Sequence, residues 1–201
     1  MGRYVKKHLK KYTASEFFQK DLIESLFEWI DVVVPIVTIF IFIMVFLFRI
    51  NDQVEGSSMM NTLHDGDRIF VNYMFTPKQG DVIVIKRGKS LEQRLVKRII
   101  ATEGQTLDIN YSTGSVIVDG KVMDEPYILG STTIDEGGKI PQIVPEGYVF
   151  VMGDNRAKSL DSRSNEIGLI SAYDIIGKVE GVLWNGKNGP KALFERSGLI
   201  S

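Results

Sequence analysis

The chain has 201 residues, 44% hydrophobic and 24% charged, so it has room for one membrane segment and one ordinary globular domain but not for a second large domain. Its 24 basic and 25 acidic residues give a net charge of −1, which argues against the broad basic field of a nucleic-acid-binding protein. It has no cysteine, which excludes disulfides, zinc-thiolate sites and a thiol nucleophile, and suits a domain outside the cytoplasm.

Residues 1–29 combine a basic tail with a helical pattern. Six Lys or Arg residues lie between Arg3 and Lys20. Thr13 and Glu16 have the spacing of a helix-capping box, and apolar residues then recur at helical intervals. We expect a cytoplasmic tail followed by a helix that lies at the membrane surface.

Residues 30–50 have the length and composition of a transmembrane anchor. The run 32–48 contains no charge, and at about 1.5 Å per residue the segment nearly crosses a hydrocarbon core of roughly 30 Å. A cleaved signal peptide is the alternative, but the run starts late and ends in Phe-Leu-Phe-Arg instead of small residues. The excess of Lys and Arg before the run predicts a single-pass protein of the cell membrane, with its N-terminus in the cytoplasm and its C-terminal domain outside.

Residues 51–201 predict a mostly β extracytoplasmic domain. Short β-branched runs alternate with turn residues, and Asp119-Gly120 predicts a tight hairpin. The Gly- and Thr-rich stretch 129–140 predicts an exposed loop or insertion. The expected strands are 68–71, 81–85, 95–100, 106–109, 115–118 and 148–152.

Two residues of this domain suggest nucleophilic catalysis. Ser58 lies in a Gly-Ser-Ser-Met turn, and Lys97 lies in an apolar strand. The only histidines are His8, which precedes the membrane segment, and His64, which follows Ser58 too closely to reach it easily. A lysine is therefore the better base, provided that burial lowers its pKa. Each residue alone has an ordinary structural explanation, as a turn serine or an exposed strand lysine.

A third polar cluster, residues 153–163, directly follows a predicted strand. It is either a solvated loop with local Asp–Arg pairs or a support that holds the lysine amine in place. Three cationic side chains in the cluster disfavour a metal site, so we expect neither a metal nor a cofactor.

Together these segments resemble the type I signal peptidase family, in the single-anchor form typical of Gram-positive bacteria. The resemblance is carried by four motifs in family order and extends over most of the chain. They are the nucleophile motif at 56–63, the substrate-strand motif at 80–84, the general-base motif at 97–100 and the Gly-Asp-Asn-Arg motif at 153–163.

The resemblance implies roles for individual residues. Ser58 is the expected nucleophile, Lys97 the general base and Ser159 the hydroxyl that orients the lysine amine. The ion pairs Asp154–Arg98 and Asp161–Arg163 support them, and backbone supplies the oxyanion hole because Gly56 has no side-chain donor. The substrate adds a strand beside residues 81–85 and 53–57 and contacts Val54, Met59, Leu63, Val82 and Val96.

The implied fold is a β-sheet or barrel-like catalytic domain, and the implied activity is a serine endopeptidase that removes signal peptides from secreted precursors. The expected partners are such precursors and the lipid bilayer, with the secretion translocon as a further candidate. Departures from the family pattern at Asn61, Gln105 and Ala157-Lys158 leave open a housekeeping or a specialised role. Two alternatives remain: a non-catalytic assembly factor that binds precursors, and a self-cleaving Ser-Lys repressor-type protein.

Overall fold

The computed structural model describes residues 14–87 and 90–184. Most of the basic tail and Thr13 of the predicted capping box lie outside the described residues. The chain divides into two compact units, residues 1–46 and residues 47–201.

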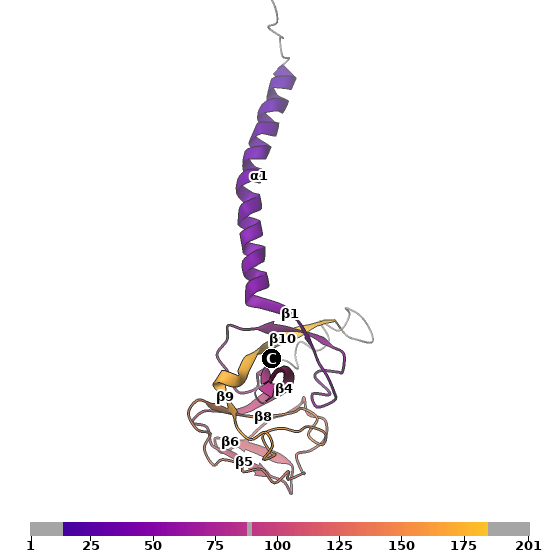
Figure 1. Cartoon of the computed structure of the whole chain (residues 1–201), viewed down its shortest axis with the longest axis vertical. Coiled ribbons are helices and arrows are strands. Elements are labelled where there is room, and N and C mark those ends of the chain that lie inside the picture. Colours follow the sequence, from indigo (N-terminus) through magenta and orange to yellow (C-terminus); the bar gives the residue numbers. More distant parts are fainter. Residues whose placement is uncertain (1–13, 88–89, 185–201) are drawn as a thin grey trace, which may run out of the picture. The chain divides into compact units, whose positions relative to one another are not determined.

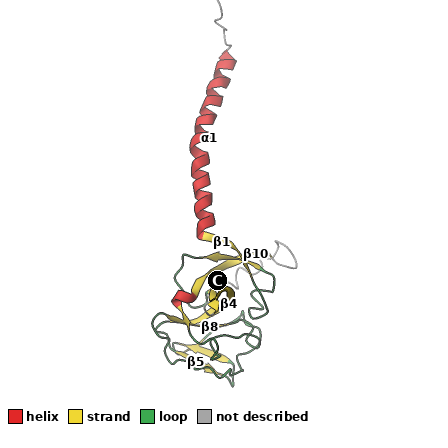
Figure 2. Ribbon diagram, in the orientation of Figure 1, coloured by secondary structure: helices red, strands yellow, loops and turns green. Residues whose placement is uncertain are grey.

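The first unit contains one long helix, α1 (Ala14–Leu47), drawn without interruption in Figures 1 and 2. Its segment Ser25–Val45 is long and apolar enough to cross a membrane. The helix continues through residue 30, the expected boundary between a surface helix and the anchor, since neither Gly nor Pro interrupts residues 14–34. The helix ends at Leu47, and residues 48–53, which include the last three residues of the expected anchor, form a strand.

The second unit is mostly β, as predicted, with helix confined to one short 3-10 segment in the described residues (Figure 2). Its larger sheet has seven strands in the order β1-β2-β10-β3-β4-β8-β9, and neighbouring strands are antiparallel. The elements are β1 (Phe48–Gln53), β2 (Arg68–Asn72), β3 (Val82–Arg87), β4 (Ser90–Thr102), β8 (Tyr148–Met152), β9 (Ile170–Ser171), the 3-10 segment η1 (Ala172–Asp174) and β10 (Ile175–Trp184).

A smaller sheet of three strands follows β4 in the chain: β5 (Leu107–Asn110), β6 (Ser115–Val118) and β7 (Lys121–Val122). The predicted hairpin at Asp119-Gly120 joins β6 to β7, and both turn residues have positive φ values, 51° and 74°. The alternating residues of β5 and β6 bury their apolar face against residues of β4 and β8, and Figure 1 shows β5 and β6 beside β8.

Strand β4 organises the larger sheet because it has two different neighbours. Its first part pairs with β3, from Arg87↔Ser90 to Val82↔Arg98, and its second part pairs with β8 from Arg98 onward. The apolar residues of β4 near Arg98 pack into three clusters: Val96 packs against the first, Ile100 and Ala101 belong to the second, and Leu95 and Ile99 lie together in the third. The strand thus passes through the middle of the domain and carries Lys97 and Arg98 where the two pairings meet.

The stretch 129–140 is irregular and mostly exposed, as predicted, but it is firmly attached to the rest of the domain. The Leu129 N–H donates to the Asp154 carbonyl (2.8 Å), and the Gly138 N–H donates to the Arg163 carbonyl (2.7 Å). Thr132 is completely buried. The loop is therefore part of the surroundings of segment 153–163.

Gly177 of β10 lies so close to β2 that the fold has no room for a side chain there. A Cβ atom at this position would lie 2.5 Å from Val71 Cγ1 and 2.7 Å from the Asn72 carbonyl oxygen. We predict that Gly177→Ala lowers the free energy of unfolding by about 1–3 kcal/mol through overpacking, measured by thermal or urea unfolding of the detergent-solubilised chain. Gly181→Ala in the same strand is the control, because a Cβ there meets nothing within 4 Å. Equal losses for the two variants would contradict the prediction.

Candidate active site

Ser58 lies in a closed loop between β1 and β2. The loop is pinned at its base by bonds from the Val54 N–H to the Asp67 carbonyl (2.8 Å) and from the Gly66 N–H to the Val54 carbonyl (2.9 Å). Gly56 has a φ of +83°, which favours glycine, and its N–H donates to Asp65 Oδ1 (2.8 Å). These bonds hold a tight turn that presents Ser58, which is half-buried.

Lys97 meets this turn from the middle of β4. Its side chain lies in the domain interior, with 2% of the residue exposed, and its strand partner is Ile83. The Lys97 Nζ donates to Ser58 Oγ at 2.8 Å. The structure thus brings together the two residues that the sequence singled out, 39 positions apart in the chain.

The surroundings of Lys97 disfavour its charged form. Desolvation is the largest influence and lowers the pKa of Lys97 from 10.5 to about 8. Asp161, Asp154 and Glu136 oppose this effect by favouring the ammonium, and Arg163 adds to it. A useful fraction of neutral amine is therefore present near neutral pH, in contact with a hydroxyl.

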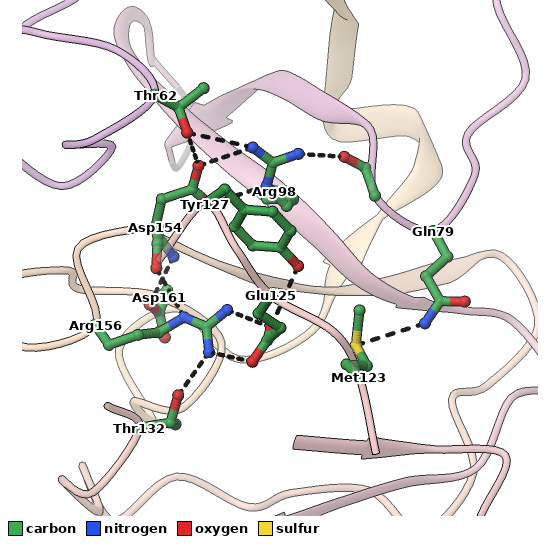
Figure 3. A network of polar contacts seen from close by, with 12 residues as sticks. Thr62, Gln79, Arg98, Met123, Glu125, Tyr127, Thr132, Asp154, Arg156 and Asp161 are labelled. Carbon is green, nitrogen blue, oxygen red and sulfur yellow. Dashed lines mark hydrogen bonds and ion pairs between the residues drawn. The ribbon is translucent and has the colours of Figure 1, made fainter. Parts of the chain in front are cut away.

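Arg98, the next residue of β4, pairs with Asp154 as expected. Its Nε and Nη2 donate to the two carboxylate oxygens at 2.9 and 2.8 Å, and both side chains are almost fully buried. Arg98 Nη1 donates to the Gly80 carbonyl (2.8 Å), Thr62 Oγ1 donates to Asp154 Oδ2, and the guanidinium lies 3.9 Å from the centre of the Tyr127 ring. Figure 3 shows this network, which ties the Ser58 loop, β4 and segment 153–163 together.

The second expected pair, Asp161–Arg163, is also formed. Arg163 Nε and Nη2 each donate to the Asp161 carboxylate at 2.9 Å, and the Gly153 N–H donates to Asp161 Oδ2 at 2.9 Å. Glu136 of the loop 129–140 adds an ion pair to Arg163 at 3.1 Å. A second bidentate pair therefore lies among the charges that act on Lys97.

The expected contact between Ser159 and the lysine amine is not made. Ser159 is 4% exposed, and its Oγ has no hydrogen-bond partner among the described residues. The hydroxyl instead lies against Gly153, where an added Cβ would come within 2.2 Å of it. Close packing against Gly153 holds this hydroxyl where it makes no hydrogen bond to the Lys97 amine. The structure therefore gives no support to the orienting role that the family resemblance implied.

The residues expected to contact substrate gather in one hydrophobic cluster, but most of them are core residues. Val54, Met59, Leu63 and Val82 are at most 3% exposed, while Val96 is partly exposed and packs against them. Such residues can lie beneath a substrate-binding surface, but they contribute little exposed area to it.

The expected addition of a substrate strand beside residues 81–85 finds no free edge at Ile83–Ile85. From Ile83 to Ile85, β3 is paired on one edge with β10 and on the other with β4. Both sets of backbone hydrogen-bonding groups are therefore already used.

Two members of the predicted Gly-Asp-Asn-Arg motif, Asn155 and Arg156, make contacts that the sequence analysis did not assign. Arg156 pairs with Glu125 and donates to Thr132 (Figure 3), and Asn155 bonds to the carbonyls of Ser57 and Ser58. No periodicity or local spacing predicts these contacts, because the partners are distant in sequence. Within the described residues, no group of three or more His, Cys, Asp or Glu side chains is arranged to hold a metal ion.

Comparisons with a family model and with individual proteins indicate the same family for this chain. The family described as "Signal peptidase, peptidase S26" matches residues 26–184. The chain is 38% identical over 177 residues to signal peptidase I T of Bacillus subtilis (strain 168), covering 84% of this chain and 90% of the relative. It is 39% identical over 162 residues to signal peptidase I of Bacillus licheniformis, covering 76% and 86%.

Among solved structures, a signal peptidase I from Enterococcus faecalis V583 is similar at 25% identity, with a TM-score of 0.42, over 52% of this chain and 97% of that one. The family match spans both the apolar helix segment and the β unit, and the two Bacillus relatives align with three quarters or more of the chain. The chain therefore belongs to the type I signal peptidases of peptidase family S26.

Proposed function

We propose that this chain is a membrane-anchored serine endopeptidase that removes signal peptides from secreted precursors, with Ser58 as nucleophile and Lys97 as general base. The observation that carries the proposal is the 2.8 Å contact between Lys97 Nζ and Ser58 Oγ, made by an amine that is buried and has a lowered pKa. A hydroxyl and a partly neutral base in contact are the two parts that nucleophilic catalysis requires.

The reaction follows from that contact. As Ser58 Oγ attacks the carbonyl carbon of the scissile peptide bond, the neutral Nζ of Lys97 accepts the hydroxyl proton. The resulting ammonium gives this proton to the leaving nitrogen when the C–N bond breaks, which leaves an acyl group on Oγ. Lys97, neutral again, takes a proton from the water that attacks the acyl carbon, and returns it to Oγ as the acid product leaves.

The negative charge that develops on the carbonyl oxygen needs donors. We assign one of them to the Ser58 N–H, because Gly56 lacks a side chain and the Ser58 N–H makes no hydrogen bond with the described residues. A fixed N–H in a largely desolvated site stabilises the transition state more than it stabilises the substrate.

The substrate has two strand edges available near Ser58. β1 is the outermost strand of its sheet, and β8 pairs with β4 only from Arg98 onward, so Leu95–Lys97 have no strand partner on that side among the described residues. We propose that the substrate binds as an extended strand along the segment 53–57, the edge of Leu95–Lys97, or both. Val96 would touch it, backed by the buried cluster of Val54, Met59, Leu63 and Val82.

The membrane has a mechanistic use in this proposal. We assign the segment 25–45 of α1 to the membrane, residues before it to the cytoplasm and the β unit to the outer side. Tethering a peptidase domain to the bilayer raises its effective concentration toward precursors whose signal peptides are held in the same bilayer.

The first prediction concerns the Ser58–Lys97 pair. Ser58→Ala and Lys97→Ala should each abolish nearly all cleavage of a synthetic precursor peptide, and the double variant should be no worse than either, because nucleophile and base act as a unit. Ser57→Ala should be much milder. If the wild-type chain binds the peptide without cutting it, the chain is the non-catalytic assembly factor instead. If the double variant loses as much activity as the two single losses combined, the two residues do not act as a dyad.

The second prediction concerns pH. Only neutral Lys97 accepts the proton, so kcat/KM should rise with pH through an apparent pKa of about 8. Lys97→Arg should be inactive at all usable pH values because guanidinium does not lose its proton, and Lys97→His should keep at most a small fraction of the rate. An active Lys97→Arg enzyme with a flat profile between about pH 6 and about pH 10 would make Lys97 a structural cation.

The third prediction concerns topology. Protease added to cells without their outer wall should digest the chain beyond residue 47 and spare a tag at residue 1, because the basic residues precede the span. The measurement is an immunoblot for tags at both ends, with detergent-permeabilised cells as the control. The reverse pattern would place Ser58 in the cytosol and favour the self-cleaving regulator.

A further inference from the structure

Asn155 is the residue that holds the Ser58 turn most directly. It follows Asp154 in segment 153–156 and is 4% exposed. Its backbone N–H donates to the Ser58 carbonyl at 2.9 Å, and its side-chain Nδ2 donates to the Ser57 carbonyl at 3.0 Å. One buried residue thus makes hydrogen bonds to two consecutive carbonyls, on either side of the Cα atom of Ser58.

The two carbonyls belong to the two peptide units that flank this Cα. Each peptide unit is planar, so fixing its carbonyl fixes the plane of the whole unit. With both planes held, the φ and ψ angles of Ser58 are held too, and so is the direction of its Cβ. The 2.8 Å contact of Oγ with Lys97 Nζ is therefore set from the backbone side by Asn155.

The side-chain bond has a second consequence. In a trans peptide the carbonyl of Ser57 and the N–H of Ser58 point in opposite directions. A donor that fixes the Ser57 carbonyl therefore also aims the Ser58 N–H, away from segment 153–156. The Ser57 carbonyl has one further donor, the Met60 N–H, at the longer distance of 3.3 Å.

Segment 153–156 approaches the turn very closely. A Cβ on Gly153 would lie 2.5 Å from the Ser58 carbonyl oxygen, so the segment and the turn are in backbone contact. Asp154 next to it is locked by Arg98 and Thr62. The two N–H donors of Asn155 are therefore held in place by the bonds of its neighbour Asp154 in segment 153–156.

We infer that Asn155 is a positioning residue for the oxyanion hole: by holding the Ser57 carbonyl with its side-chain amide, it aims the Ser58 N–H at the oxygen of the scissile carbonyl. The inference rests on the proposed function and adds a residue to its machinery. Asn155 touches no reacting atom and acts through the peptide unit between Ser57 and Ser58.

The test is the isosteric variant Asn155→Asp, which replaces the side-chain donor by an oxygen facing the Ser57 carbonyl. The assay uses the full chain in detergent and a synthetic peptide that spans a signal-peptide cleavage site, with Ala at the first and third positions before the scissile bond. We expect kcat to fall about 100-fold, which is the usual effect of losing an oxyanion-hole donor. KM should change less than about threefold. Asn165→Asp is the matched control, because Asn165 Nδ2 donates to the Gly137 carbonyl (2.8 Å) in an exposed loop. It should keep the wild-type kcat.

A second variant separates aiming from general loosening of the turn. Asn155→Ala should lose affinity for a peptide boronate, which forms a tetrahedral adduct with a serine Oγ, in parallel with kcat/KM. It should bind an uncleavable peptide with Pro after the scissile bond as tightly as the wild type does. The rise of its kcat/KM with pH should have the same apparent pKa as in the wild type, because Asn155 does not contact Lys97.

Two results would overturn the inference but not the proposed function. The first is an Asn155→Asp enzyme whose kcat lies within about twofold of that of an active wild type. The second is an Asn155→Ala enzyme that loses affinity for the boronate and for the uncleavable peptide to the same extent and also has a lowered Tm. A wild-type chain that fails to cleave any precursor peptide would overturn the proposed function and the inference with it.

Discussion

The site depends on one physical constraint, the removal of the Lys97 amine from water. Lowering its pKa from 10.5 to about 8 corresponds to roughly 3 kcal/mol of lost stability at pH values below the lowered pKa, where the lysine is charged in both the folded and the unfolded chain. As pH rises from about 8 to 10.5 this cost disappears, because the folded state no longer binds the proton. The apolar strands around the amine must offset that cost, and they do so with residues such as Ile83 and Ile99 that have no exposed area.

Buried carboxylates near the lysine would undo this effect unless they were themselves neutralised. Asp154 and Asp161 both favour the ammonium form, yet each is held in a bidentate pair with an arginine, Arg98 or Arg163. Removing one partner of such a pair leaves an uncompensated buried charge, which is costly. The pairs thus let polar, hydrogen-bonding groups surround the lysine while limiting the field that they exert on it.

Segment 153–163 is the frame that joins these parts. It pairs with β4 through Asp154 and Arg98, bonds to the Ser58 turn through Asn155, and anchors the loop 129–140 through Arg163 and Glu136. The nucleophile and the base come from separate elements, so their relative position is only as well defined as the segment that contacts both. Four charged residues of this segment, Asp154, Arg156, Asp161 and Arg163, are at most 1% exposed.

The sequence alone determined the features that depend on local pattern: the apolar helix, the mostly β unit, the Asp119-Gly120 hairpin, and the choice of Ser58 and Lys97 through the shortage of histidine. Hydropathy does not report where an apolar run leaves the helix and enters β1, so the end of the helix at Leu47 came from the structure. Only the tertiary structure decided that both edges of Ile83–Ile85 are occupied, that Ser159 has no bond to the lysine, and that Asn155 and Thr62 hold the site. These features arise from pairings between residues about 10 to 100 positions apart, which no periodicity along the chain encodes.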